Sequence, residues 1–166
     1  MRLITSLLVG SFLISCSSLK SIDAGGSRRG EYENYLSEHL KVDRLYMKLR
    51  EMAIGRALMI TPESAALQAK VVPGFELLPV EGKTLFVVSL EMQDWSRFSI
   101  SDFNFLLGEQ KATSVKEIMD EQLLNTLYPF AVPHDRAFVV EFDSPVASTL
   151  KIQTSQGQFE FNYGEG

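Results

Sequence analysis

Cysteine occurs only once in the 166 residues of this chain, as Cys16. A lone cysteine cannot form a disulfide within the chain, and it cannot supply the C-x-x-C spacing of redox or zinc sites. The folded part of the protein must therefore be stabilised by packing alone. Histidine is almost as scarce, with two residues, and neither H-E-x-x-H nor H-x-H occurs. The sequence therefore predicts no metal site and no cofactor.

Signatures of catalysis are missing as well. There is no G-x-S-x-G nucleophile elbow, and no glycine-rich phosphate loop follows an expected strand. His134 and Asp135 are adjacent in a segment punctuated by prolines, which supplies an imidazole and a carboxylate for a hydrolase but no nucleophile. His39 is expected at the edge of the core, bonded to a carbonyl or a water. We therefore expect a non-enzymatic protein, with a hydrolase using His134 as an alternative.

A concentrated basic surface is also absent. Lysine and arginine number 16 against 21 acidic residues, which gives a formal net charge of −5. The basic residues do not gather into a long stripe along the sequence. Since binding to nucleic acid requires a basic footprint, we expect no nucleic-acid partner.

What the chain does contain, at its start, is an uncharged and mostly apolar run from Leu3 to Ile14, which follows Met1 and Arg2. The run holds about a dozen residues, whereas a helix needs roughly 20 to span a bilayer. A short positive segment followed by a short apolar one is typical of a secretory signal peptide. We expect residues 1–15 to be such a signal and to be removed.

The run leads into Leu13-Ile14-Ser15-Cys16, which resembles the lipobox of bacterial lipoproteins, although a smaller residue is commoner at the position of Ile14. The resemblance implies that Cys16 receives a diacylglyceryl group, that the chain is cut before it, and that its new amino group is acylated. Two or more acyl chains anchor a protein stably, because each buried methylene contributes about 0.8 kcal/mol. Ser17 stands where an Asp would retain such a protein in the inner membrane. The resemblance therefore implies the outer membrane, facing the periplasm.

The rest of the chain divides into a short linker and one domain. Residues 16–30 are rich in Ser and Gly and are expected to form a lipidated cysteine with a flexible tether. Residues 31–166 have the size of a single globular domain. Within it, apolar residues recur at spacings of three and four over residues 31–52, which predicts a long amphipathic helix. Leu45 and Leu49 lie on its apolar stripe, and we expect both to be buried against a sheet.

Shorter elements follow this helix. A strand is expected at residues 54–61 and a short helix at about residues 62–70, since Thr61 is a good cap and Pro62 suits the first helical position.

Apolar residues then alternate with a period of two through most of residues 84–163, which predicts strands with one mostly polar face and a closing hairpin near Gly157. Within residues 114–130 a helix competes with a strand, and the capping-box pair of Ser114 and Glu117 favours the helix.

Together these elements predict an α+β, mainly β fold: an antiparallel β-sandwich with one long N-terminal amphipathic helix and one or two short helices. The length and the phenylalanine-rich alternation resemble the immunoglobulin-like domains of many bacterial envelope lipoproteins. The order of long helix, strand, short helix and further strands also resembles Gram-negative envelope lipoproteins of this size. The cysteines of true immunoglobulin domains are absent, so the resemblance concerns the architecture alone, and it implies no catalytic motif.

The only tryptophan, Trp95, lies among polar residues between two expected strands. Tryptophan is enriched in binding hot spots, which makes Trp95 the candidate partner-binding residue; the alternative is a ring folded over the end of the core. We expect the domain to serve as a binding or structural module for another envelope protein.

Two other functions remain open from the sequence. A carrier or chaperone for an apolar ligand would need an apolar cavity of about 300 Å³ or more. A hydrolase would need His134 within hydrogen-bond reach of a Ser or Thr hydroxyl.

Overall fold

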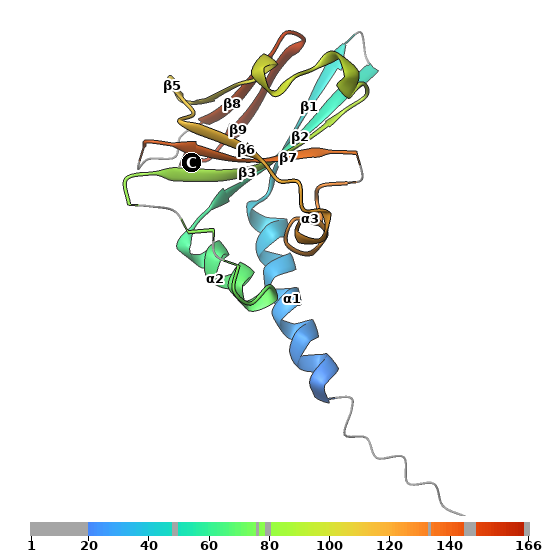
Figure 1. Ribbon diagram of the computed structural model, residues 1–166, viewed down its shortest axis with the longest axis vertical. Helices are drawn as coiled ribbons and strands as arrows, with labels where there is room; N and C mark the ends of the chain where they lie inside the picture. Colours follow the sequence, from blue (N-terminus) through green and yellow to red (C-terminus); the bar gives the residue numbers. More distant parts are fainter. Residues whose placement is uncertain are drawn as a thin grey trace, which may run out of the picture.

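Two antiparallel sheets and three α-helices form the described part of the protein in the computed structural model (Figure 1). The structure describes residues 20–47, 50–75, 77–78, 81–132, 134–144 and 149–164, and for residues 20–27, 47, 50 and 97 it describes the backbone only. The expected lipobox with Cys16 lies outside these residues, and so does Leu49. No helix among the described residues is long and apolar enough to cross a membrane.

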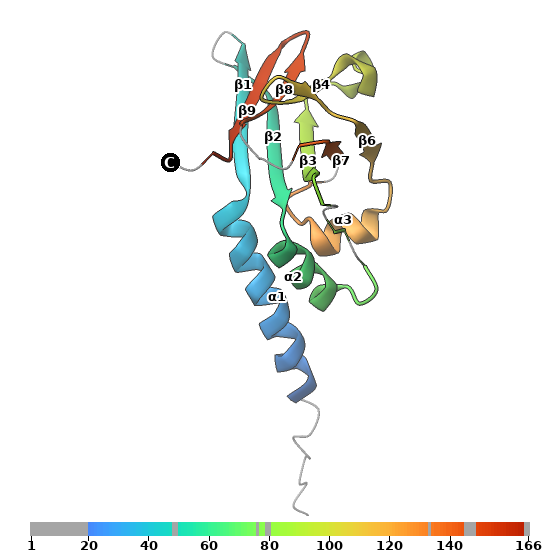
Figure 2. The ribbon, with the colours of Figure 1, turned by 90° about the vertical axis from the view of Figure 1, so that its left-hand side faces the viewer.

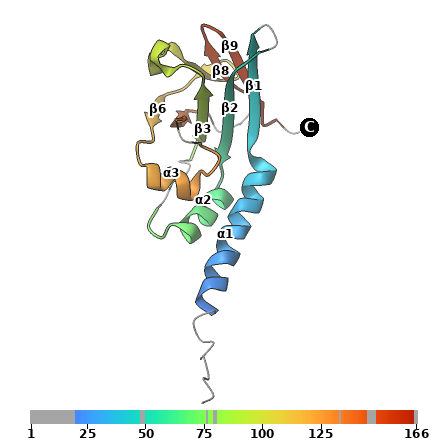
Figure 3. The same ribbon diagram turned by 90° about the vertical axis from the view of Figure 1, so that its right-hand side faces the viewer.

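The first helix, α1 (Lys20–His39), contacts the rest of the fold through its C-terminal half. Tyr32, Tyr35 and Leu36 are buried there, whereas the earlier turns extend away from the sheets (Figures 2 and 3). Since α1 begins at Lys20, the flexible tether expected over residues 16–30 is helical from that residue onward.

The helix expected over residues 31–52 is wrong beyond His39. The chain continues instead as β1 (Lys41–Met47) and β2 (Arg50–Ile60), which pair with each other in antiparallel fashion. Leu45 is half-buried against the core from β1 rather than from a helix. The apolar positions of this segment fit a helical spacing, but pairing with distant strands outweighs local propensity.

The larger sheet, sheet A, has the strand order β1-β2-β3-β7-β6. Its further strands are β3 (Thr84–Met92), β7 (Arg136–Phe142) and β6 (Ser114–Glu117). The β2–β3 pairing runs from Ala53 opposite Met92 to Ile60 opposite Leu85. The expected alternation in β3 is confirmed, but its second face is also buried, so the expected polar face is wrong for this strand.

The smaller sheet, sheet B, has the order β5-β4-β8-β9. It contains β4 (Asn104–Leu107), β5 (Gln110–Lys111), β8 (Thr149–Thr154) and β9 (Gly157–Asn162). The closing hairpin predicted near Gly157 is confirmed, with Thr154 opposite Gly157. Two short 3-10 turns, η1 (Trp95–Arg97) and η2 (Ile100–Asp102), connect sheet A to sheet B.

One core lies between the two sheets, an arrangement compatible with the predicted β-sandwich. Aromatic side chains dominate it, and the fully or nearly fully buried ones are Phe86, Phe103, Phe105, Phe138, Phe142, Phe159 and Phe161. Gly55 of β2 faces the rings of Phe159 and Phe161 of sheet B across this core. A Cβ at that position would lie 2.8 Å from Cδ1 of Phe159, so only glycine lets the ring pack there without moving.

A second apolar cluster lies on the other face of sheet A, beneath the helices (Figure 1). α1, α2 (Pro62–Val71) and α3 (Glu121–Leu127) cover Leu58 and Val87 there. A buried polar chain links the three helices: the Tyr32 hydroxyl donates to the Leu127 carbonyl at 2.7 Å, and Gln68 bonds the hydroxyls of Tyr32 and Tyr128. These bonds satisfy polar atoms that the helical layer would otherwise bury without partners.

Of the two helix caps predicted from the sequence, the structure contains one. The helix predicted at residues 62–70 is confirmed as α2, and the Thr61 side chain accepts from the Ser64 N–H. The pair of Ser114 and Glu117 does not cap a helix, because both residues lie in β6. Helix α3 begins only after Asp120, whose carboxylate accepts from the Leu123 N–H at 2.9 Å.

Candidate functional site

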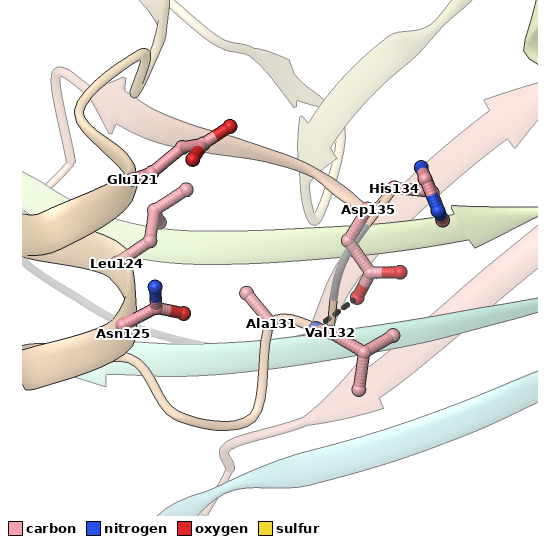
Figure 4. Close-up of a pocket in the computed structure, with 7 residues that line it drawn as sticks. All are labelled: Glu121, Leu124, Asn125, Ala131, Val132, His134 and Asp135. Atoms are coloured by element: carbon pink, nitrogen blue, oxygen red, sulfur yellow. Dashed lines mark hydrogen bonds between the residues drawn. The ribbon is translucent and has the colours of Figure 1, made fainter.

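A cleft of about 210 Å³ lies between α3 and the turn that leads into β7 (Figure 4). We call it the Asp135 cleft, and its lining residues are Glu121, Leu124, Asn125, Ala131, Val132, His134 and Asp135. Figure 4 shows the α3 residues on one wall and Asp135 with His134 on the opposite wall. The cleft therefore combines carboxylate and amide groups with an apolar lining.

Short-range hydrogen bonds shape the turn. The Ala131 N–H donates to the Tyr128 carbonyl at 2.8 Å, and the Asp135 N–H donates to the Val132 carbonyl at 3.0 Å. Tyr128 is itself fully buried at the end of α3, which fixes where the turn starts.

Asp135 ties this turn to sheet A. Its side chain is only 1% exposed. Its Oδ2 accepts from the Ser89 hydroxyl at 2.6 Å, from Arg56 Nη1 at 3.1 Å and from the Val132 N–H at 3.1 Å. Arg56 also contacts Glu91, with 2.8 Å between Nη2 and Oε2. The turn, β2 and β3 are thus held together through one carboxylate oxygen.

The other oxygen of Asp135 is unusual. Oδ1 is buried and has no hydrogen-bond partner among the described residues. Burial raises the pKa of the Asp135 carboxyl above its ordinary value, although the bonds from Ser89 and Val132 and the charge of Arg56 oppose that rise. A buried polar atom without a partner in a native fold calls for a specific explanation.

His134 has a left-handed backbone, with φ of 80°, which is uncommon for a residue other than glycine. Its side chain is exposed, and the Asp135 carboxylate points toward the Val132 N–H rather than toward the imidazole (Figure 4). Backbone strain of this kind tends to gather at functional sites.

The described residues do not form a catalytic triad around His134. The hydroxyl nearest to the Asp135 carboxylate is that of Ser89, which is fully buried and donates to Oδ2. No hydroxyl bonds the His134 ring within the described ranges.

Trp95, the candidate for partner binding, is half-buried at the end of the core between the sheets. Its ring centroid lies 5.9 Å from that of Phe103, and the Arg136 guanidinium carbon lies 5.0 Å from the centroid of the Trp95 ring. Arg136 forms a bidentate ion pair with Glu117: its Nε donates to Oε1 at 2.6 Å and its Nη2 donates to Oε2 at 2.7 Å. The indole Nε1 is buried and lacks a partner in the part of the chain that the structure describes.

A second cleft, of about 220 Å³, lies where α1 ends near β9, and Tyr35, His39, Lys41 and Tyr163 contribute to its lining. The His39 ring stacks on Tyr35 with 4.0 Å between centroids, and its Nδ1 lies 2.9 Å from the Tyr35 carbonyl oxygen. The predicted bond from His39 to a carbonyl is confirmed.

The described residues contain no group of three or more His, Cys, Asp or Glu side chains placed to hold a metal ion. Comparison of the chain with protein-family models, with curated proteins and with solved structures found no match.

Reasoning from sequence identified His134 and Asp135 as neighbours but missed Arg56 and Ser89. Both are polar residues within strongly apolar strand sequences, I-G-R-A-L in β2 and V-V-S-L in β3. A polar side chain on a buried strand needs a partner, so these polar residues could have indicated a buried polar contact. The pairing register brings Arg56 directly opposite Ser89.

Proposed function

We propose that this chain is a lipid-anchored lipoprotein of the bacterial envelope, whose domain is a non-enzymatic binding or structural module in the periplasm. The observation that carries the proposal is Leu13-Ile14-Ser15-Cys16 at the end of a short uncharged run. The only thiol of the chain lies there, and Ser17 after it favours the outer membrane. Another envelope protein is the proposed partner.

The position of α1 supports this arrangement. Its early turns extend away from the sheets, and a helix rises 1.5 Å per residue, so residues 20–30 separate the body from the start of α1 by about 15 Å. The η1–η2 segment and the β8–β9 turn lie at the end of the molecule opposite the start of α1 (Figure 2). An anchor at Cys16 would leave that end free to meet a partner.

We further propose that the two sheets form an immunoglobulin-like sandwich, as in other envelope lipoproteins. The shared aromatic core and the antiparallel pairing of both sheets support this class. The helices on the outer face of sheet A would then be an addition to the sandwich.

A binding module is favoured over a carrier by the size of the clefts. The two clefts described above measure about 210 and 220 Å³, and both have polar groups in their lining. A pocket for an apolar ligand would be about 300 Å³ or more.

Metabolic labelling tests the anchor. Cells that express the full chain should incorporate radiolabelled palmitate into it, and Cys16→Ala should abolish the label and leave a longer, unprocessed or mis-cleaved chain. Ser17→Ala is the matched control, because it changes the neighbouring residue and keeps the thiol. Equal labelling of the Cys16→Ala variant and the parent would rule out the lipobox.

A further inference from the structure

The cleft of about 220 Å³ where α1 ends near β9 has an aromatic floor (Figures 2 and 3). Tyr35 and Tyr163 line it, and both hydroxyls are already bonded within the protein. The Tyr35 hydroxyl lies 3.0 Å from Oγ1 of Thr61, and the Tyr163 hydroxyl donates to the Ala57 carbonyl at 2.7 Å. Met59 adds its half-buried thioether chain. Because the polar ends of both rings are engaged, the floor offers aromatic and hydrocarbon surface to a ligand.

His39 adds a flat ring to this cleft, which we call the His39 cleft. The imidazole stacks on Tyr35 with 9° between the ring planes. Its Nδ1 lies 2.9 Å from the Tyr35 carbonyl oxygen; since a carbonyl only accepts, Nδ1 carries the hydrogen and Nε2 is an acceptor in the neutral ring. Among the described residues Nε2 has no hydrogen-bond partner, and no second ring stacks on the imidazole. His39 is exposed, so one ring face and Nε2 are open to a ligand.

Exposed polar groups of both kinds surround the floor. Glu38 supplies a carboxylate and Lys41 an ammonium group. Neither of these two side chains forms an ion pair within the described ranges. Asn162 contributes a side-chain amide whose Oδ1 already accepts from the Gly164 N–H at 2.9 Å, which leaves its NH₂ as a donor. The rim of the cleft therefore combines donors with acceptors, and its two charges cancel.

This combination favours a small, uncharged ring that bears hydroxyl groups. A hydroxyl both donates and accepts, which matches the mixed rim, whereas an anion would meet the charge of Glu38 and a cation that of Lys41. The C–H face of a sugar ring packs well on aromatic rings, because their faces carry partial negative charge. The cleft is smaller than the sites of drug-sized ligands, which measure about 300–1,000 Å³. In so small a cleft, a single ring contacts the floor and the rim together.

We propose that the His39 cleft binds one pyranose ring of a carbohydrate, either a free sugar or a ring within a cell-wall glycan. The C–H face of the sugar lies against the aromatic surface, and its hydroxyls bond the polar groups of the rim. The cleft lies on the flank of the body, away from the η1–η2 end proposed for a protein partner (Figure 2). This inference therefore adds a ligand to the proposed function, and it rests on that function only for the cell-wall source.

A titration tests the ligand chemistry. The full chain, with isotope-labelled methionine methyls and in polyoxyethylene micelles that contain no sugar, is titrated with methyl β-D-glucopyranoside. The Met59 methyl signal should shift and saturate, with a dissociation constant on the order of millimolar for so small a contact. Met119, which is 80% exposed on the loop before α3 and outside the cleft, is the internal control and should not shift.

Two further probes check that the ring is recognised. Glucitol has the hydroxyls without the ring and should cause no saturable shift. Glycyl-glycine is a zwitterion that matches the charges of Glu38 and Lys41 but has no ring, and it should also fail to saturate. No saturable shift with the glycoside, or saturation by glucitol or glycyl-glycine equal to that by the glycoside, would overturn the proposal.

Substitutions test the site. His39→Ala should weaken binding roughly threefold or more, because it removes the open ring face and Nε2. Ser37→Ala, at an exposed position of the same helix outside the cleft, should leave binding unchanged. Lys41→Met keeps the hydrocarbon stem but removes the donor and should also weaken binding, whereas Lys111→Met on β5 should not. Parent-like affinity of His39→Ala would contradict the proposal, and Lys41→Met decides in the same way if His39→Ala does not fold.

Cosedimentation with purified, insoluble cell wall distinguishes the two sources. Cosedimentation that methyl β-D-glucopyranoside reverses would identify the glycan as the source. Saturable binding of the glycoside without cosedimentation would identify a free sugar. Palmitate labelling is independent of both measurements, so loss of the anchor proposal and loss of the His39 cleft proposal are separate results.

Discussion

Arg56, Ser89 and Asp135 interrupt the apolar helical face of sheet A, and Arg56 and Ser89 both donate to Oδ2 of Asp135 there. Arg56 is 15% exposed at its side chain and Asp135 is 1% exposed, so both charges are largely removed from water. Breaking such a pair by removing one partner leaves an uncompensated buried charge, which costs more than the pair contributes. At the scale of single residues, the turn before β7 is therefore fixed by polar contacts, and the cleft that it lines is a consequence.

The sequence left two interpretations of Trp95, a partner-binding residue or a ring folded over the end of the core, and the structure favours the second. The ring packs on Phe103 and Arg136 at the end of the core and is half-buried, as expected for a lid over the core. Its role in partner binding stays a prediction.

Trp95→Ala should lower the free energy of unfolding by about 1–3 kcal/mol, less than the cost of truncating a fully buried tryptophan, because the side chain is partly exposed. Urea denaturation measures the change. Tyr46→Ala is the matched control: Tyr46 is an aromatic residue 61% exposed on β1, and its loss should cost less than about 1 kcal/mol. A normal unfolding midpoint combined with weaker capture of a crosslinked partner would instead identify Trp95 as a contact residue.

Helix α1 has two different halves. The C-terminal half buries Tyr32, Tyr35 and Leu36 against α2 and sheet A, and the N-terminal half extends from the body (Figure 3). Because helical stability in proteins comes mainly from packing of an apolar face, the two halves should contribute very differently to stability.

Leu36→Ala should destabilise the domain by about 2–5 kcal/mol, since Leu36 is 6% exposed and its removal leaves a cavity. Thermal and urea unfolding measure this change. Asn34→Ala, at an exposed position two residues away, should be neutral or slightly stabilising because alanine has the higher helix propensity. An unchanged midpoint for Leu36→Ala would mean that α1 is a stalk that does not contribute to the fold.

The whole molecule is layered, with the helices on one face of sheet A and sheet B on the other. β3 lies in the middle and is buried on both faces. Apolar surface is thus removed from water in two separate clusters, which a two-sheet sandwich alone would not provide. Because ionisable groups such as Asp135 lie between these layers, the free energy of unfolding should depend on pH.

The pKa of Asp135 is raised by folding, so the native state binds its proton more tightly than the unfolded state does. Its contribution to stability is therefore lost as pH rises through and above the ordinary pKa of aspartate, about 3.9. Glu117 has the opposite effect on the pH dependence of stability. The hydrogen bond from Arg136 lowers the pKa of Glu117. Its contribution to stability is therefore present above the ordinary pKa of glutamate, about 4.3, and is lost as pH falls below that value.

Asp135→Asn should accordingly become more stable relative to the parent as pH rises from about 3 to about 6, and Glu117→Gln should become less stable relative to the parent over the same range. Urea midpoints of the three proteins at several pH values measure both slopes. Constant structural effects of each substitution do not change the sign of a slope. Slopes of equal sign in the two variants would contradict this assignment.

Local signals in the sequence determined several features by themselves. The cap at Thr61 with Pro62, the alternation in β3 and the β8–β9 hairpin are short-range patterns, and each is found where it was predicted. Their physical causes act within a few residues, through caps, turns and side-chain periodicity, so no knowledge of distant partners was needed. The interpretation of Cys16 likewise depends on its immediate neighbours alone.

Only the tertiary structure decided the boundary between α1 and β1, the second buried face of β3, and the composition of the Asp135 cleft. Residues 41–52 carry apolar spacings that fit a helix, but β2 finds a partner in β3, which is remote in the sequence. Strand register places Arg56 opposite Ser89, and the turn before β7 brings Asp135 to both; register is a property of paired strands rather than of any one segment. For the same reason, the Asp135 cleft could not be predicted from any single segment of the sequence.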